Sequence, residues 1–313
     1  MKKILIYILS AVLCASLFAC NRTAPQADTG KLSIVTTIFP PYDFARAIAG
    51  DRASLSMLLP PGSESHSFEP TPKDVITIRN CDVFIYVGGE SDEWVRDVLE
   101  SVDTSKMTIV TLMDCVTAVE EETVEGMQDG EEEAAEEPEY DEHVWTSPKN
   151  AKLIVQKISD ALAARDADNA EFYKSNTSEY LQKLDALDAQ LQAVADSAVR
   201  RTIVFGDRFP FRYLADAYGL EYFAAFPGCS TETEASAATV KFLIDKIIAE
   251  KIPVVFHIEM GNKRMANTLA EETGAKVLLL HACHNISKAD FEAGKTYIDI
   301  MTENVSALKE ALS

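Results

Sequence analysis

The chain has 313 residues, with 50 Asp and Glu against 29 Lys and Arg, and a formal net charge of −21. This length suits one large or two medium domains with a substantial hydrophobic core. The charge excludes nucleic acid as the expected partner, because phosphate binding needs clustered Lys and Arg side chains.

The N-terminus predicts a secretory signal peptide that ends at a lipidated cysteine. A basic start is followed by an apolar run from 4 to 13, which is too short to span a bilayer. Leu17-Phe18-Ala19-Cys20 resembles a bacterial lipobox, in which the cysteine is lipidated and becomes the new N-terminus. We therefore expect an extracytoplasmic protein anchored to the cell membrane through Cys20. An ordinary signal peptide cut elsewhere is the alternative.

Beyond the polar residues that follow Cys20, short β-rich segments alternate with helical patterns. The predicted strands are 32–37, 54–59, 82–87, 107–112, 202–205, 221–225, 253–258 and 276–280. Alternating strands and helices imply parallel sheets covered by helices. The four strands at each end of the chain thus predict one α/β lobe each.

One long helix is predicted between the two sets of strands, from about 168 to 197. It carries an apolar side chain every three or four residues and contains no Gly or Pro: Tyr173, Thr177, Tyr180, Leu184, Leu187, Leu191 and Val194. The expected fold is therefore α/β, with two lobes joined by a rigid helix. The expected segments are a signal peptide 1–19, a lipidated tether 20–31, an N-terminal lobe 32–166, a linking helix 167–200 and a C-terminal lobe 201–313.

The segment 120–142 differs from the rest of the first lobe, because thirteen of its residues are Asp or Glu. Self-repulsion and low apolar content predict a disordered surface loop. A solvated loop without a role and a weak cation-gathering loop are both open interpretations.

Three of the five histidines lie in loops that can converge. His66 is in the loop after a predicted strand, His143 follows the acidic segment and precedes the helix start at Ser147-Pro148, and His281 directly follows the last predicted strand. Ligands of parallel sheets bind at the carboxyl ends of the strands, so these side chains are expected near the cleft between the lobes. Imidazole is a common zinc ligand. From spacing alone, solvated loop histidines are an equal alternative.

Residues 58–74 contain Pro-Pro-Gly-x-x-x-His-x-Phe-Glu-Pro, and His66 is its histidine. This segment resembles the signature of the metal-specific solute-binding lipoproteins of bacterial ABC importers, the zinc and manganese uptake proteins. The likeness extends through 38–43, 84–89, 143–145 and 209–211. It implies two α/β lobes bridged by a helix, and capture of a divalent metal for a membrane permease.

The resemblance also implies metal ligands at His66, His143 and His281. The family's third ligand, a His or Glu, falls at Gly206 here, and glycine offers no side chain. A tetrahedral site would then need another donor. The additional candidates are Asp207 and His284, ranked above Glu259, or a water molecule.

Three imidazoles favour Zn²⁺ as the transported ion over Mn²⁺, which prefers carboxylate and water. We expect binding and release without bond chemistry, no enzyme activity, an ABC permease as partner and a monomeric protein. Glu69 is a candidate hydrogen-bond partner of a ligand imidazole. A secreted zinc hydrolase is the rival class, although the chain lacks His-Glu-x-x-His and Gly-x-Ser-x-Gly. A metal-binding surface adhesin, acting in cell adhesion, is a third interpretation.

Four cysteines remain after Cys20: Cys81, Cys115, Cys229 and Cys283. In an oxidising compartment they can pair in three ways or remain as small buried side chains. Cys229 with Cys283 is the candidate disulfide, because both are expected to follow strands at the same end of one sheet.

Overall fold

The computed structural model describes residues 30–127, 139–230 and 234–313. The signal peptide, Cys20, nearly all of the tether and residues 128–138 of the acidic segment lie outside the described residues. Residues Leu32–Ser313 form one compact unit. In the described part of the chain, no helix is both long enough and apolar enough to cross a membrane.

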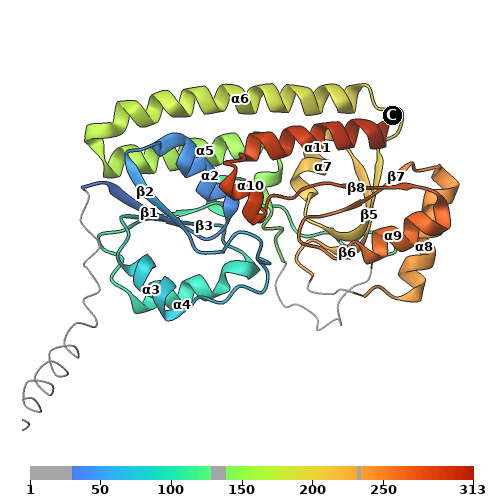
Figure 1. Cartoon of the computed structure of the whole chain (residues 1–313), viewed down its shortest axis with the longest axis horizontal. Helices are drawn as coiled ribbons and strands as arrows, with labels where there is room; N and C mark the ends of the chain where they lie inside the picture. Colours follow the sequence, from blue (N-terminus) through green and yellow to red (C-terminus); the bar gives the residue numbers. More distant parts are fainter. Residues whose placement is uncertain (1–29, 128–138, 231–233) are drawn as a thin grey trace, which may run out of the picture. The chain divides into compact units, whose positions relative to one another are not determined.

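The first sheet contains four parallel strands in the order β2-β1-β3-β4. They are β1 (Leu32–Thr36), β2 (Ala53–Met57), β3 (Val83–Tyr86) and β4 (Thr108–Thr111). Figure 1 shows helices on both faces of this sheet, with α2 (Phe39–Ala49) on one face and α3 (Pro72–Arg79) and α4 (Glu93–Ser101) on the other. The Thr71-Pro72 start of α3 is a capping box, in which Thr71 and Asp74 exchange hydrogen bonds.

The second sheet repeats this arrangement with the order β6-β5-β7-β8, again fully parallel. Its strands are β5 (Thr202–Phe209), β6 (Glu221–Pro227), β7 (Val254–His257) and β8 (Lys276–Leu279). Its helices are α7 (Arg212–Tyr218), α8 (Ala237–Glu250), α9 (Arg264–Thr273), α10 (Lys288–Glu292) and α11 (Tyr297–Leu312). Helices α8 and α9 pack on one face through Leu243, Ile247, Ala266 and Leu269.

Between the sheets the chain forms α5 (Pro148–Arg165) and the long helix α6 (Ala170–Asp196). Every residue of the predicted apolar stripe of α6 is buried. Asn176 donates a hydrogen bond to the Ile48 carbonyl in the first lobe (2.9 Å), and Asp188 accepts one from Tyr218 in the second lobe (2.8 Å). Figure 1 shows α6 extending along both sheets, beside α11.

These two parallel sheets and the long helix confirm the predicted α/β fold. All eight predicted strands are present, although β5 is longer than the predicted 202–205. Four short 3₁₀ turns complete the described elements: η1 (Glu90–Asp92), η2 (Met113–Cys115), η3 (Val144–Thr146) and η4 (Ala167–Asn169). The lobe boundaries at 166 and 201 stay a prediction.

The stripe of α6 gives a first prediction. Leu184 is fully buried, so Leu184→Ala removes apolar contacts and leaves a cavity. We expect a loss of about 2–5 kcal/mol in the free energy of unfolding, measured by urea denaturation. The exposed neighbour Gln182 is the control, and Gln182→Ala should stay within about 0.5 kcal/mol of the wild type. Equal stabilities of the two variants would contradict the assignment of the buried face.

Candidate metal centre

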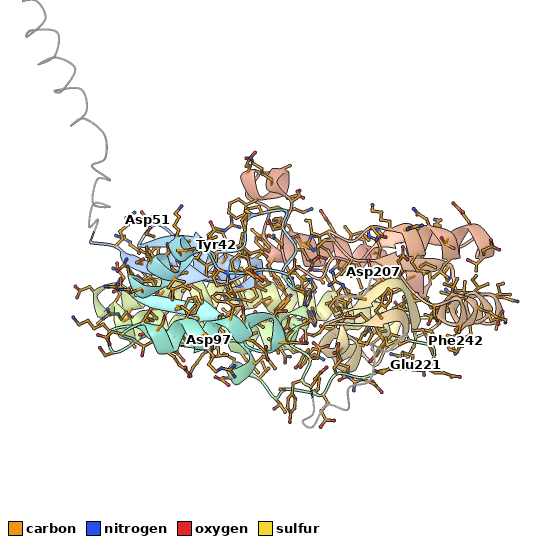
Figure 2. The ribbon with its side chains drawn as sticks, turned by 90° about the horizontal axis from the view of Figure 1, so that it is seen from below. Tyr42, Asp51, Asp97, Asp207, Glu221 and Phe242 are labelled. Atoms are coloured by element: carbon orange, nitrogen blue, oxygen red, sulfur yellow. The ribbon has the colours of Figure 1, made fainter. Side chains whose placement is uncertain are left out.

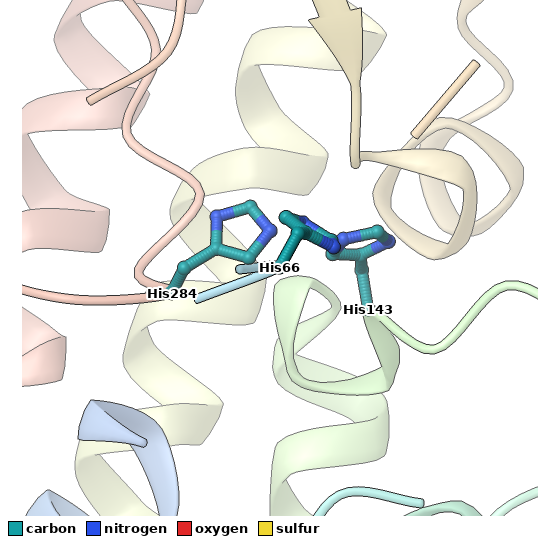
Figure 3. Close-up of side chains that lie close together, drawn as sticks. All are labelled: His66, His143 and His284. Carbon is teal, nitrogen blue, oxygen red and sulfur yellow. The ribbon is translucent and has the colours of Figure 1, made fainter. Parts of the chain in front are cut away.

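Three histidines meet where loops from the two sheets converge (Figure 3). His66 lies in the loop after β2, His143 directly precedes η3, and His284 follows β8. The ring centroids are 4.8 Å apart for His143 and His284, and 5.2 Å apart for His66 and His284. One ring nitrogen from each side chain can be chosen so that all three lie within 4.8 Å of one another. This spacing is small enough for the three rings to share one metal ion.

Two of these rings are oriented by buried carboxylates. The Nδ1 atom of His143 lies 3.0 Å from Oδ1 of Asp141, and the Nδ1 atom of His284 lies 3.1 Å from Oε1 of Glu259. An ionised carboxylate only accepts hydrogen bonds, so in both rings Nδ1 carries the hydrogen. Such carboxylate–histidine pairs orient the imidazoles of metal sites.

His66 is oriented through a serine. Its Nδ1 atom lies 2.8 Å from the Ser91 hydroxyl oxygen, and that hydroxyl donates its only hydrogen to Glu142. The Ser91 oxygen must therefore accept from His66, which places the ring hydrogen on Nδ1 here too. Among the described residues, Glu69, the partner expected from the sequence, forms no hydrogen bond with a histidine, and Ser91 is the partner of His66 instead.

The Nε2 atoms of all three rings are buried and have no hydrogen-bond partner among the described residues. Leaving a buried polar atom unpaired costs about 1–3 kcal/mol. With Nδ1 carrying the hydrogen, each Nε2 has a free lone pair, which is the form that binds a metal ion. Three such lone pairs in one place fit a zinc ion, for which His nitrogen is a standard ligand.

His281, expected from the sequence as the third ligand, is not among these three rings. Its Nδ1 accepts a hydrogen bond from the Cys283 amide (3.0 Å) and lies 3.4 Å from Oε2 of Glu259. Its backbone N–H and carbonyl both bond to the Asn304 side chain, each at 2.8 Å. These contacts hold His281 outside the cluster, where the structure places His284 instead.

The segment that carries His284 is bonded to the first lobe although it follows a strand of the second. The Ala282 carbonyl accepts a hydrogen bond from the Trp145 indole N–H (2.7 Å). The Asn285 side chain donates to the carbonyls of Pro60 and Ser63 at 2.7 and 2.8 Å. His284 is therefore held in place against the loops of His66 and His143.

The position expected for another family ligand is closed by packing. A Cβ atom at Gly206 would lie 2.5 Å from the backbone N and Cα atoms of Ala266 in α9. The next residue, Asp207, accepts hydrogen bonds from the backbone amides of Arg208 (2.9 Å) and Ile258 (3.2 Å). Figure 2 shows Asp207 among the elements of the second sheet. Asp207 lines a cavity of about 340 Å³ together with His66, but it is not part of the histidine cluster.

The remaining candidates have structural surroundings of their own. His257 lies in β7, where its Nδ1 is 2.8 Å from the Ile258 carbonyl. Cys229 and Cys283 are free thiols in the structure, so the expected disulfide is not formed. The Cys283 side chain is buried beside the His281 carbonyl, whereas Cys229 follows β6 near His143.

The pKa values of the three rings are shifted in different directions. Burial, reinforced by His284, His143 and Arg208, lowers the pKa of His66. Burial also lowers the pKa of His284, although Glu259 opposes it. Burial acts in the same direction at His143, but Asp141 and other nearby carboxylates outweigh it and raise the pKa of His143 above 6.5. His143 is thus the ring on which a proton competes most with a metal ion.

Comparisons with known proteins agree with this geometry. The profile described as zinc-uptake complex component A, periplasmic, matches residues 34–311. The chain belongs to this family. It is 36% identical over 311 residues to the zinc-binding lipoprotein AdcA of Streptococcus pneumoniae serotype 4, covering 99% of this chain but 61% of AdcA. It is 33% identical over 298 residues to the high-affinity zinc uptake system protein ZnuA of Bacillus subtilis, covering 94% and 93% of the two chains.

The crystal structure of the Zn(II)-bound ZnuA-like domain of S. pneumoniae AdcA superposes on the protein with a TM-score of 0.75 and 32% identity. The match covers 90% of this chain and 99% of that domain. The family inferred from the sequence signature is therefore confirmed. The chain spans only about six-tenths of the length of the AdcA relative.

The packing at Gly206 gives a second prediction. Gly206→Ala places a methyl group against the backbone of Ala266, which cannot move without shifting α9. We expect a loss of about 1–3 kcal/mol in the free energy of unfolding, measured by urea denaturation. An unchanged stability would show that this position can carry a side chain.

The raised pKa of His143 gives a third prediction. Below that pKa the ring is protonated, and Zn²⁺ has to displace the proton in order to bind. The apparent affinity for Zn²⁺ therefore falls about tenfold for each pH unit below the pKa. In the wild type this loss should begin above pH 6.5, the ordinary His value. Asp141→Asn removes the main group that raises the pKa, so the loss should begin at lower pH. The measurement is a Zn²⁺ dissociation constant at several pH values, and identical onsets in both proteins would contradict the assignment.

Proposed function

We propose that this protein captures Zn²⁺ outside the cytoplasm and delivers it to the membrane permease of an ABC importer. Two observations on His66, His143 and His284 carry the proposal. Each ring has a buried Nε2 without a hydrogen-bond partner among the described residues, and one ring nitrogen from each side chain lies within 4.8 Å of the other two. Relatives named for zinc binding and zinc uptake, and the family description as a zinc-uptake component, support it.

The donor set favours zinc over manganese. Imidazole nitrogen binds zinc well, whereas manganese prefers carboxylate, carbonyl and water oxygens. The nearby carboxylates of Asp141 and Glu259 are bonded to the ligand rings and to backbone amides, so they orient the donors. At a shared nitrogen site the general order of affinities also places zinc above manganese.

The role is binding and release, and the imported ion is the cargo. The family is described as an uptake component, which supports this role over hydrolysis. We further propose that the protein is a monomer with two lobes, that it binds one ion per chain, and that residues 20–31 tether it to the membrane. The name of AdcA as a lipoprotein supports lipidation at Cys20, which lies outside the described residues.

The proposal is tested on residues 21–313 by titrating Zn²⁺ in competition with a chelating dye. We expect one ion per chain. Loss of a partner that only orients a ligand costs roughly 10–100-fold in metal affinity, so removal of a ligand should cost more. His66→Ala and His284→Ala should therefore each weaken binding by more than about 100-fold.

The matched control is His281→Ala, because His281 is a neighbouring histidine outside the cluster. It should weaken binding by less than about tenfold. In cells, the His66→Ala protein should fail to support growth at scarce zinc, and added zinc should restore it. Wild-type affinity in the His66→Ala or His284→Ala protein would refute the proposed site.

A further inference from the structure

A thiol lies beside the histidine cluster. The Sγ atom of Cys229, a ring nitrogen of His143 and a carboxylate oxygen of Glu142 lie within 4.8 Å of one another. His143 belongs to this group and to the three-histidine group, and its Nε2 is buried without a hydrogen-bond partner among the described residues. Cys229 follows β6, so it approaches from the second lobe.

The backbone around Cys229 is built for this close approach. The Cys229 amide donates a hydrogen bond to the Glu121 carboxylate (2.9 Å). A Cβ atom at Gly228 would lie 3.2 Å from Cε1 of His143 and 3.0 Å from the Phe209 carbonyl oxygen. A side chain at position 228 would therefore be tight against the imidazole and the Phe209 carbonyl, and glycine lets the chain pass close to His143 without displacing these neighbours.

The other donors near the cluster are already engaged. The Glu142 carboxylate accepts from the Ser91 amide (3.0 Å) and hydroxyl, and it lies 3.6 Å from Nδ1 of His66, not on the Nε2 side. The Glu259 carboxylate accepts from the amides of Ala282 (2.7 Å) and His284 (2.9 Å). A structural zinc ion takes four ligands in a tetrahedron, and three imidazoles leave one position open.

We propose that Cys229 supplies the fourth ligand, as a thiolate from the second lobe, and completes a three-histidine, one-cysteine zinc site. This inference rests on the proposed zinc-capturing function and adds a ligand to it. As the zinc–sulfur bond forms, the thiol proton leaves to solvent.

Zinc binding must then draw Cys229 inward. Bond lengths of about 2.3 Å to sulfur and 2.0–2.1 Å to nitrogen place Sγ about 3.6 Å from each ligand nitrogen in a tetrahedron. Cys229 does not yet lie within 4.8 Å of all three histidines. His66, His143 and His284 are held by the first lobe and its bonded segment, so Cys229 has to move toward them.

A thiolate also sharpens selectivity. Sulfur is a soft ligand that binds zinc well and manganese poorly. Removal of the sulfur should therefore reduce the affinity for zinc more than the affinity for manganese. A role of Cys229 in packing alone would not change the ratio of the two affinities.

The experiment uses Co²⁺ as a spectroscopic substitute for zinc, with a non-thiol reductant present. Wild-type residues 21–313 should show an intense thiolate-to-cobalt charge-transfer band in the near ultraviolet. Cys229→Ser should lose this band while still binding Co²⁺. Cys115→Ser is the matched control, because Cys115 is also partly exposed but bonds to the Thr111 carbonyl away from the cluster, and it should keep the band.

A second measurement needs no variant. In the wild type, Zn²⁺ should protect Cys229 from alkylation, mapped by mass spectrometry, while Cys115 continues to react. Zinc affinity in Cys229→Ser should fall at least tenfold, with manganese affinity nearly unchanged.

The outcomes separate the two proposals. One Co²⁺ per chain that depends on His66 and His284, without a thiolate band or protection of Cys229, would overturn the thiolate ligand and leave the zinc-capturing function standing. No bound metal in the wild type would overturn both.

Discussion

The hydrogen bonds that the three Nδ1 atoms donate are the constraint on which the candidate site depends. Asp141, Glu259 and the Ser91 hydroxyl each hold one ring so that Nε2 is the atom left without a partner. A protein interior rarely leaves several polar atoms unpaired, because each costs free energy. Among the described residues, three unpaired nitrogens on neighbouring rings are therefore what the proposed metal site requires, and an arrangement set by packing alone would leave their free-energy cost uncompensated.

The architecture explains how residues far apart in sequence meet there. Both sheets are parallel with the same strand order, and the loops after their strands converge. The loop after β2 brings His66, the loops after β6 and β7 bring Cys229 and Glu259, and the chain after β8 brings His284. Hydrogen bonds from Trp145 and Asn285 fasten this last segment to the first lobe. The histidines are thus preorganised on one side of the centre, which reduces the ordering needed when an ion binds.

The sequence predicted the eight strands well because a buried parallel strand is a short β-rich run between turn signals. His66 and His143 were also predictable, since each lies in a motif of the family. The choice between His281 and His284 was not. That choice depends on Cys283, whose backbone has a φ of 65°. It also depends on Glu259, which lies 25 residues before His284 and accepts a hydrogen bond from the His284 amide. Such long-range contacts leave no periodic signal, and the packing of Ala266 over Gly206 leaves none either.

Charge balance connects the site to the acidic composition of the chain. A dication bound by neutral imidazoles carries its full charge into a poorly solvated region, which is costly unless negative groups lie nearby. Three carboxylates provide this charge without binding the metal themselves: Asp141, Glu142 and Glu259. Asp141 and Glu259 accept hydrogen bonds from ligand rings, and Glu142 accepts one from Ser91, the partner of His66. Burial, and to a smaller extent the charge of Asp141, raises the pKa of Glu121, as expected where neighbouring carboxylates repel one another. An arriving cation relieves that repulsion, so the groups that orient the ligands also favour the metal-bound state over the empty one.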